Sequence, residues 1–144
     1  MQITRGIFAA ALALGLAGAA FAQEGLPQAR TFAGVSYITG GIGLDESTAI
    51  KAAEKDFTLS LLFAQYKRGE YLSDVKVSIK DKAGKTVLDA VSDGPMLLAK
   101  LPAGVYKISA EHDGSALSKT VRIGAKGVTR AVFVWQPTGE ATIE

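Results

Sequence analysis

The stretch Leu101-Pro102-Ala103-Gly104-Val105-Tyr106-Lys107-Ile108 decides the fold of this 144-residue chain. Pro102 fixes φ at the corner of a turn, and Gly104 permits a backbone geometry that larger residues disfavour. Tyr106 follows two residues later and returns a large ring to a core between two sheets. The stretch therefore predicts a turn followed by a strand that packs inward.

Short apolar segments with a period of two flank this stretch on both sides, as half-buried strands require. The side chains of Phe57, Leu59, Leu61 and Phe63 are predicted to share one face. Turns follow at intervals of eight to twelve residues, one of them at 67–70, and this spacing is typical of an antiparallel sandwich of about seven strands. The predicted strands are 57–63, 75–80, 86–91, 96–101, 105–111, 116–123 and 128–135, with a further strand at 31–39.

One segment departs from the period of two. Residues 45–55 carry acidic side chains at their start and apolar side chains at positions 49, 50 and 53. Acidic residues complement the positive end of a helix dipole, and the apolar spacing gives the segment one buried face. The segment is predicted to form one short N-terminal helix.

Four pieces of sequence carry a resemblance to a known family. They are Val75-Lys76-Val77-Ser78-Ile79, Gly84-Lys85-Thr86-Val87, Ser92-Asp93-Gly94 and the opening stretch. Over residues 75–123 the chain resembles the carboxypeptidase regulatory-like family, with a departure at Pro95. The resemblance implies an all-β, seven-stranded, antiparallel Ig-like or transthyretin-like (prealbumin-like) sandwich. Its motif concerns architecture and is silent about chemistry.

The N-terminus has the features of a secretory signal peptide. Arg5 precedes an uncharged run at 6–22, and small residues lead up to the predicted cleavage between Ala22 and Gln23. A membrane anchor needs about 20 apolar residues, whereas the run has 17, many of them Ala or Gly. We therefore expect a signal peptide at 1–22, a sandwich domain at 23–135 and a disordered tail at 136–144. The predicted location is the periplasm of a Gram-negative bacterium, or the outside of the cell.

Charge argues against nucleic acid and anionic membranes as partners, and cysteine content argues against a lipid anchor. Removing residues 1–22 takes away one of the 16 basic residues and leaves all 14 acidic ones, so the net charge falls from +2 to +1. A charge this small gives no electrostatic case for nucleic acid or an anionic membrane. The chain has no Cys, so it cannot carry a lipoprotein anchor and its stability depends on its core.

The chain has one His, and this count argues against several enzymes built on similar sandwiches. Zinc carboxypeptidases need two His ligands and a carboxylate. Transthyretin-like hydroxyisourate hydrolases and intradiol dioxygenases also depend on more than one His. His112 lies in Glu111-His112-Asp113-Gly114, where a solvated turn imidazole is expected. The prediction is that the chain is not an enzyme, with no catalytic residues and no cofactor.

The acidic residues at turns have the right chemistry for calcium but the wrong spacing. The regular Asp-x-Asp-x-Asp-Gly pattern of a calcium loop is absent, so solvated turn acids and no metal site are predicted. The acids concerned are Asp81, Asp89, Asp93, Glu111 and Asp113.

A candidate binding site lies around Gly40-Gly41-Ile42-Gly43 and the helix that follows. Glycines before a helix can bind phosphate through backbone N–H groups, but Asp45 and Glu46 place negative charge there. The segment lies outside the family pattern, so a function peculiar to this chain is expected near Tyr37, Asp45 and Glu46. Residues 128–135 are apolar on both faces, which favours a central strand covered by the helix; a docking surface is the alternative.

Two functions remain open from the sequence. The first is a non-catalytic interaction module of the bacterial envelope that holds a protein or a glycan by a sheet edge or by loops. The second is a protein that binds a small molecule or a metal between residues 40–55 and the sandwich.

Overall fold

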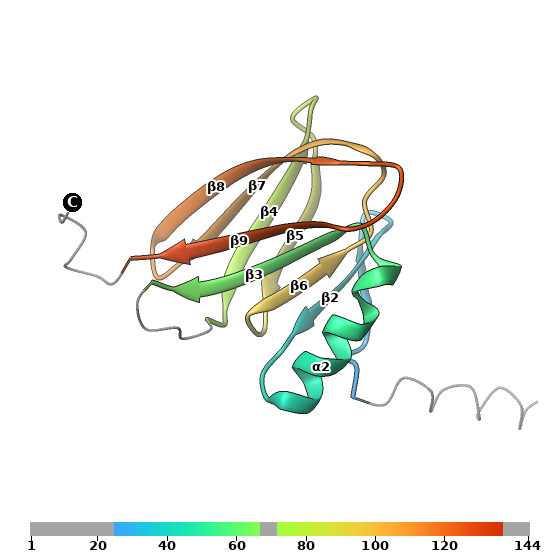
Figure 1. The fold of residues 1–144 in the computed structure, drawn as a ribbon. Helices are drawn as coiled ribbons and strands as arrows, with labels where there is room; N and C mark the ends of the chain where they lie inside the picture. The colour runs from blue at the N-terminus through green and yellow to red at the C-terminus, as the bar shows by residue number, and fades with distance from the viewer. Residues whose placement is uncertain (1–24, 67–71, 137–144) are drawn as a thin grey trace, which may run out of the picture.

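The computed structural model describes residues 25–66 and 72–136, which form two β-sheets packed face to face (Figure 1). Sheet A has the order β1 (Arg30–Phe32), β2 (Val35–Gly40), β6 (Met96–Ala99), β3 (Leu59–Gln65) and β9 (Thr129–Trp135). Sheet B has the order β5 (Thr86–Ser92), β4 (Val75–Asp81), β7 (Gly104–His112) and β8 (Ser115–Ile123). The predicted signal peptide, the predicted turn at 67–70 and all but the first residue of the predicted tail lie outside the described residues.

The mostly β fold predicted from the sequence is confirmed, but its strand count and pairing differ from the prediction. The described residues form nine strands, partly because the segment expected at 31–39 is a hairpin, β1–β2. Ala33 and Gly34 have positive φ at its turn, which reverses the chain. The β3–β9 pair is parallel, from Leu59 opposite Thr129 to Gln65 opposite Trp135, so sheet A is mixed.

The main core fills the space between the two sheets. Side chains alternate along β3 and β4, and the apolar side chains of the inward faces are buried, among them Leu61, Phe63, Val77 and Ile79. The stretch that opens β7 contributes Tyr106, whose ring is buried and whose hydroxyl donates to the Pro102 carbonyl at 2.8 Å. The ring thus packs in the core while its polar end closes the turn, as in the tyrosine corners of other sandwiches.

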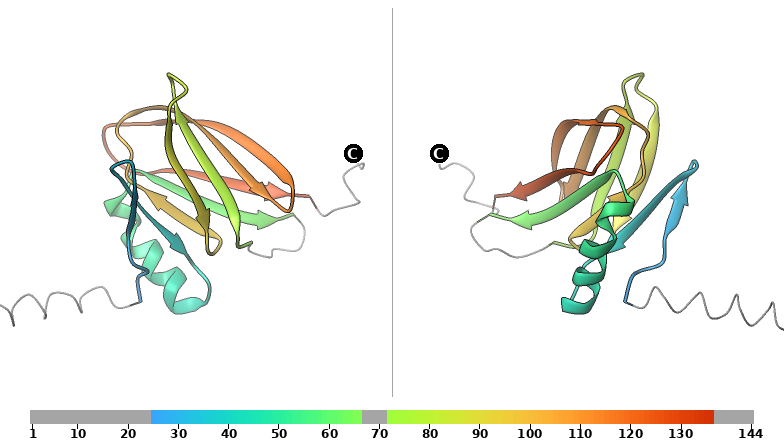
Figure 2. Two further views of the ribbon diagram at one scale, coloured as in Figure 1. Left: turned by 180° about the vertical axis from the view of Figure 1, so that it is seen from behind. Right: turned by 45° about the vertical axis from the view of Figure 1, so that its right-hand side comes forward.

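The helix α2 (Leu44–Ala53) covers only part of the outer face of sheet A (Figures 1 and 2). Ile50, its one fully buried side chain, packs on Ile38 of β2 and Leu98 of β6. A 3-10 turn, η2 (Glu54–Asp56), follows. Phe57 joins this outer cluster, so the prediction that Phe57 shares a face with the inward residues of β3 is wrong. Phe57 precedes the strand, where the period of two does not yet hold.

Strand β9 is an edge strand, which overturns the prediction of a central strand under the helix. Ala131, Phe133 and Trp135 face the core, whereas Val132 and Val134 remain 44% and 40% exposed on the outer face. Because α2 lies over β2 and β6, it leaves the outer face of β9 open. The described helices are all too short or too polar to cross a membrane.

Candidate functional site

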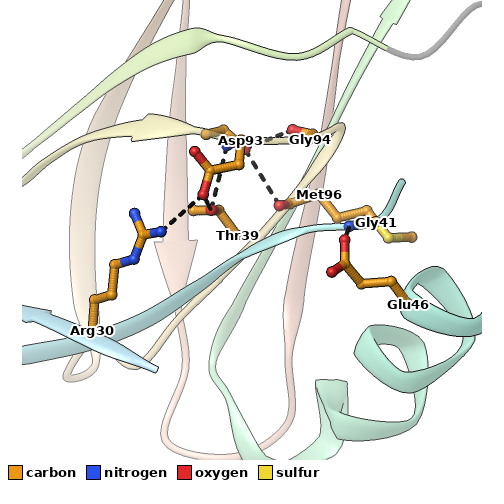
Figure 3. Close-up of polar contacts among 8 residues, drawn as sticks. Arg30, Thr39, Gly41, Glu46, Asp93, Gly94 and Met96 are labelled. Carbon is orange, nitrogen blue, oxygen red and sulfur yellow. Dashed lines mark hydrogen bonds and ion pairs between the residues drawn. The ribbon is translucent and has the colours of Figure 1, made fainter. Parts of the chain in front are cut away.

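A polar cluster ties the β5–β6 turn to sheet A (Figure 3). The Arg30 guanidinium donates to the Asp93 carboxylate at 2.9 Å. The buried Thr39 hydroxyl donates to the same carboxylate at 3.1 Å and accepts from the Asp93 backbone N–H at 3.3 Å. Ser92, fully buried, donates from Oγ to the Gly94 carbonyl at 2.7 Å. These contacts satisfy the polar groups of the turn, so Ser92-Asp93-Gly94 anchors the fold.

Gly94 has a steric reason to be glycine. A Cβ built on it would lie 2.4 Å from the backbone oxygen of Gly40, far inside van der Waals contact. The β5–β6 turn therefore packs directly against the end of β2, where the chain leaves sheet A for α2.

The Glu46 carboxylate accepts hydrogen bonds from the backbone N–H groups that would otherwise be free to bind a phosphate. Its Oε1 accepts from the N–H group of Gly41 at 2.8 Å (Figure 3). It also accepts from the N–H group of Ile42 at 3.2 Å. This contact fixes the glycine turn and satisfies donors that precede the helix.

The three candidate residues from the sequence do not converge. Tyr37 lies in the main core between the sheets, whereas Ile38, the next residue, faces α2. Asp45 is exposed at the start of α2, and Glu46 turns back on the glycine segment. Adjacent strand residues point to opposite faces, which separates Tyr37 from the helix.

Three hollows surround α2. One of about 380 Å³ is lined by Arg30, Thr39, Glu46 and Asp93 of the polar cluster. A second, of about 680 Å³, lies beside Phe57, with Lys100 and Asp56 both on its wall. The third, of about 360 Å³, lies between the first turns of α2 and the outer face of sheet A, and we call it the α2 groove. Its lining residues are Gly41, Gly43, Leu44, Ser47, Lys51, Leu62, Pro95 and Met96.

A bidentate ion pair joins the end of α2 to β9. The Arg130 guanidinium donates to the Glu54 carboxylate through Nη2 at 2.8 Å and through Nε at 3.1 and 3.2 Å. The hydrogen bond from Arg130 is the main cause that lowers the pKa of Glu54, against the opposing effect of burial. A bond from Ser60 and the charges of Arg130 and Lys51 lower it further.

The outer face of β3 and β9 beside the helix is apolar and open. Val132 lies opposite Leu62, and Val134 lies opposite Ala64, so the four side chains form two rows across this strand pair. We call these four residues the valine face. The sequence signal for this surface was the apolar character of both faces of residues 128–135.

His112 is not the solvated turn residue that the sequence predicted. It ends β7, its ring makes an edge contact with Trp135 at 6.0 Å between centroids, and its Nδ1 is buried with no hydrogen-bond partner among the described residues. The indole N–H of Trp135 donates to the Ser115 carbonyl at 2.9 Å. In the part of the chain that the structure describes, no three His, Cys, Asp or Glu residues gather closely enough to hold a metal.

No protein-family model matches the chain. No curated protein matches it either. Among solved structures, it is similar to the 5-hydroxyisourate hydrolase of Klebsiella pneumoniae, with 22% identity and a TM-score of 0.46. The likeness covers 58% of this chain and 92% of the hydrolase chain.

The prediction that the chain is not an enzyme is contradicted by this comparison, because the similar structure is that of an enzyme. The likeness is too weak to assign a reaction to the chain. Over residues 25–66 and 72–136, the mostly β, two-sheet architecture with one short α-helix is consistent with a transthyretin-like sandwich.

Proposed function

We propose that this chain is an exported domain of the carboxypeptidase regulatory-like kind that binds an extended segment of a partner protein along β9. The bound segment adds a strand to sheet A, and its alternate apolar side chains pack on the valine face. Backbone hydrogen bonds supply affinity in this mode of recognition, and the pattern of side chains supplies specificity.

The observation that carries the proposal is an apolar outer surface on a strand that ends sheet A. β8 of the other sheet lies near this edge, where the Trp135 indole N–H donates to the Ser115 carbonyl and the Thr129 hydroxyl to the Arg122 carbonyl, so the bound segment must enter beside β8. β9 is seven residues long and has a ladder partner, β3, on one side. Its outward side chains include Val132 and Val134, exposed beside Leu62. An exposed edge with apolar side chains is the kind of surface that proteins normally protect unless it is used.

The other edge strands of the described sheets offer less apolar surface to a partner. β8 carries the exposed Lys119, whose Nζ lies 5.8 Å from the centre of the Phe133 ring of β9, and a charge on an edge strand opposes pairing. β5 carries the exposed Asp89 and lies beside β1 and β2. β1 is three residues long, which leaves little edge for a partner.

The location of the partner follows from the N-terminal sequence. A signal peptide at 1–22 would deliver the domain to the periplasm. The chain has no Cys, so its stability in that compartment would come from its core and not from disulfides. We therefore place the partner in the bacterial envelope.

Site-specific photo-crosslinking in intact cells tests the proposal. A photo-crosslinking amino acid in place of Val134 is expected to give one dominant adduct with an envelope protein. The same amino acid in place of Val91, which is 47% exposed on the edge strand β5, serves as the matched control and is expected to give no such adduct.

A second substitution makes the test specific. Val132→Lys places a charge on the valine face and is expected to abolish the adduct at position 134, while changing the free energy of unfolding by only about 0.5 kcal/mol, as exposed substitutions do. Equal adducts at positions 134 and 91, or an adduct that survives Val132→Lys, would show that β9 is not the docking edge.

A further inference from the structure

We infer that the α2 groove binds a single-chain amphiphile with an anionic head, such as a free medium-chain fatty acid. The acyl chain lies between α2 and the outer face of sheet A, and the carboxylate lies at Lys51. This site adjoins the valine face through Leu62, which belongs to both, but its ligand and its test are different, and the inference does not rest on the proposed function.

The walls of the groove are suited to an apolar chain. Leu44 lies on the helix side, and Leu62, Pro95 and Met96 lie on the sheet side. A volume of about 360 Å³ lies in the lower part of the range for ligand pockets, about 300 to 1,000 Å³. The groove therefore suits one slender chain better than a fused-ring ligand or a folded domain.

Glycine keeps the floor and mouth of the groove open. A Cβ at Gly41 would lie 2.9 Å from the Cγ and Sδ atoms of Met96, so a side chain there would displace Met96. At Gly43 a Cβ would meet no atom within 4 Å, which means that this position faces open space. Both glycines have positive φ, so the same turn that leads into α2 also leaves the hollow beside it unfilled.

One lining side chain, Leu44, is apolar and exposed at the entrance. It is 80% exposed, the most exposed large apolar side chain in the described residues; Ile42, two residues earlier in the chain, is 64% exposed but does not line the groove. An exposed apolar side chain beside an apolar hollow indicates a surface that a ligand covers. An acyl chain that leaves the groove would cover Leu44 first.

The charge of the groove selects the head group. Lys51 is the one charged residue that lines it, and within the described part of the chain it forms no close ion pair, although its charge acts on Glu54. The nearby carboxylates are already engaged, because Glu46 binds the amides of Gly41 and Ile42 and Glu54 is held by Arg130. A ligand carboxylate at Lys51 would therefore meet a cation without competition from a lining acid.

Calorimetric titration of the purified protein with decanoate, below its micelle concentration, tests the inference. We expect saturable binding of one decanoate per chain, and weaker binding of decanol and of decyltrimethylammonium, which lack the negative charge. Lys51→Met retains much of the apolar stem but removes the charge, and it is expected to weaken decanoate binding roughly twofold to fivefold, the effect of a partly exposed ion pair.

Matched controls separate the groove from the rest of the surface. Lys55→Met removes a cation of the same helical region that does not line the groove, and it is expected to leave decanoate binding unchanged. Leu44→Asp is expected to abolish binding, whereas Val91→Asp on β5 is not. Circular dichroism establishes that each variant is folded.

Three results would overturn the inference. One is the absence of saturable decanoate binding to the folded protein. Another is equal binding of decanoate and decyltrimethylammonium, which would show that Lys51 does not recognise the charge of the head group. The third is capture of the protein by phosphatidylglycerol vesicles in a manner that depends on Leu44, because Leu44 and Ile42 would then bind a lipid surface instead of a free chain.

Discussion

Gly94 and Gly40 approach so closely that this single contact controls how the β5–β6 turn packs on sheet A. A Cβ on Gly94 would meet the Gly40 backbone oxygen at 2.4 Å, and backbone atoms cannot move aside as a flexible side chain can. The turn is also held by Thr39, through its hydrogen bonds with Asp93. Any relief of the clash must therefore disturb these bonds.

Gly94→Ala is expected to destabilise the protein by about 2 kcal/mol or more, as overpacking and lost buried hydrogen bonds do. Urea unfolding measures the effect. Gly84→Ala is the matched control: Gly84 has positive φ, but a Cβ there would meet no atom within 4 Å, so only the backbone cost of about 1 kcal/mol is expected. If Gly94→Ala were no worse than Gly84→Ala, close approach would not be the reason for the glycine.

At this scale the sequence predicted some residue roles well. The return of Tyr106 to the core follows from local turn chemistry and is confirmed by the buried ring. The sequence could not predict the bond from the Tyr106 hydroxyl to Pro102, nor that burial, and then the charge of Asp81, raise the pKa of Tyr106. Both depend on three-dimensional distances. His112 was misplaced because the strand β7 continues to it, which brings its ring to Trp135.

The helix α2 shows what local pattern can and cannot predict at the scale of elements. Its existence followed from acidic residues at its start and the apolar spacing around Ile50, and its observed bounds, Leu44–Ala53, lie close to the predicted 45–55. The strand that it covers was wrongly predicted. Apolar content on both faces of residues 128–135 fits a buried strand and an exposed docking edge equally well, and only the long-range pairing of β9 with β3 distinguishes them.

The bond between Glu54 and Arg130 gives the α2–β9 connection a pH dependence. The folded-state pKa of Glu54 is lowered from its ordinary value of 4.5, chiefly by the Arg130 hydrogen bond. A lowered carboxyl pKa contributes stability that is present above the unfolded-state value and is lost as pH falls through the folded-state value. The contribution is modest, because the Arg130 side chain is 65% exposed and solvent screens the pair.

Glu54→Gln is expected to lower the Tm slightly at pH 7 and to have a smaller effect near pH 3, because the wild-type carboxyl loses its charge as the pH falls through its lowered folded-state pKa. Thermal unfolding followed by circular dichroism at both pH values measures this. Glu111→Gln, which removes a carboxylate with no ion pair among the described residues, should give no such pH-dependent difference. An equal loss for Glu54→Gln at both pH values would mean that packing, not charge, explains the effect.

At the scale of the whole molecule, the two apolar clusters share the strands of sheet A. The main core lies on its inner face and the smaller cluster of Ile38, Ile50, Phe57 and Leu98 on its outer face. Tyr37 and Ile38 are consecutive residues of β2 but belong to different clusters. The packing of one cluster therefore depends on the same strand backbone that supports the other. We therefore expect the helix and the sandwich to unfold together, as small single domains usually do.

Ile50→Ala tests this coupling. Ile50 is 1% exposed, and removing its buried methyl and methylene groups should cost about 2 to 4 kcal/mol of unfolding free energy. Trp135, the one Trp of the chain, lies at the end of β9 and makes its fluorescence a probe of the sandwich. If the molecule is one unit, the urea transitions followed by fluorescence and by far-ultraviolet circular dichroism coincide in the variant, and both midpoints fall.

The exposed Ile42 provides the control, since Ile42→Ala should leave the free energy of unfolding from either probe within about 0.5 kcal/mol of the wild-type value. A fluorescence midpoint that stayed at the wild-type value in Ile50→Ala would mean that α2 is an independent cover, and that sheet A holds its order without it.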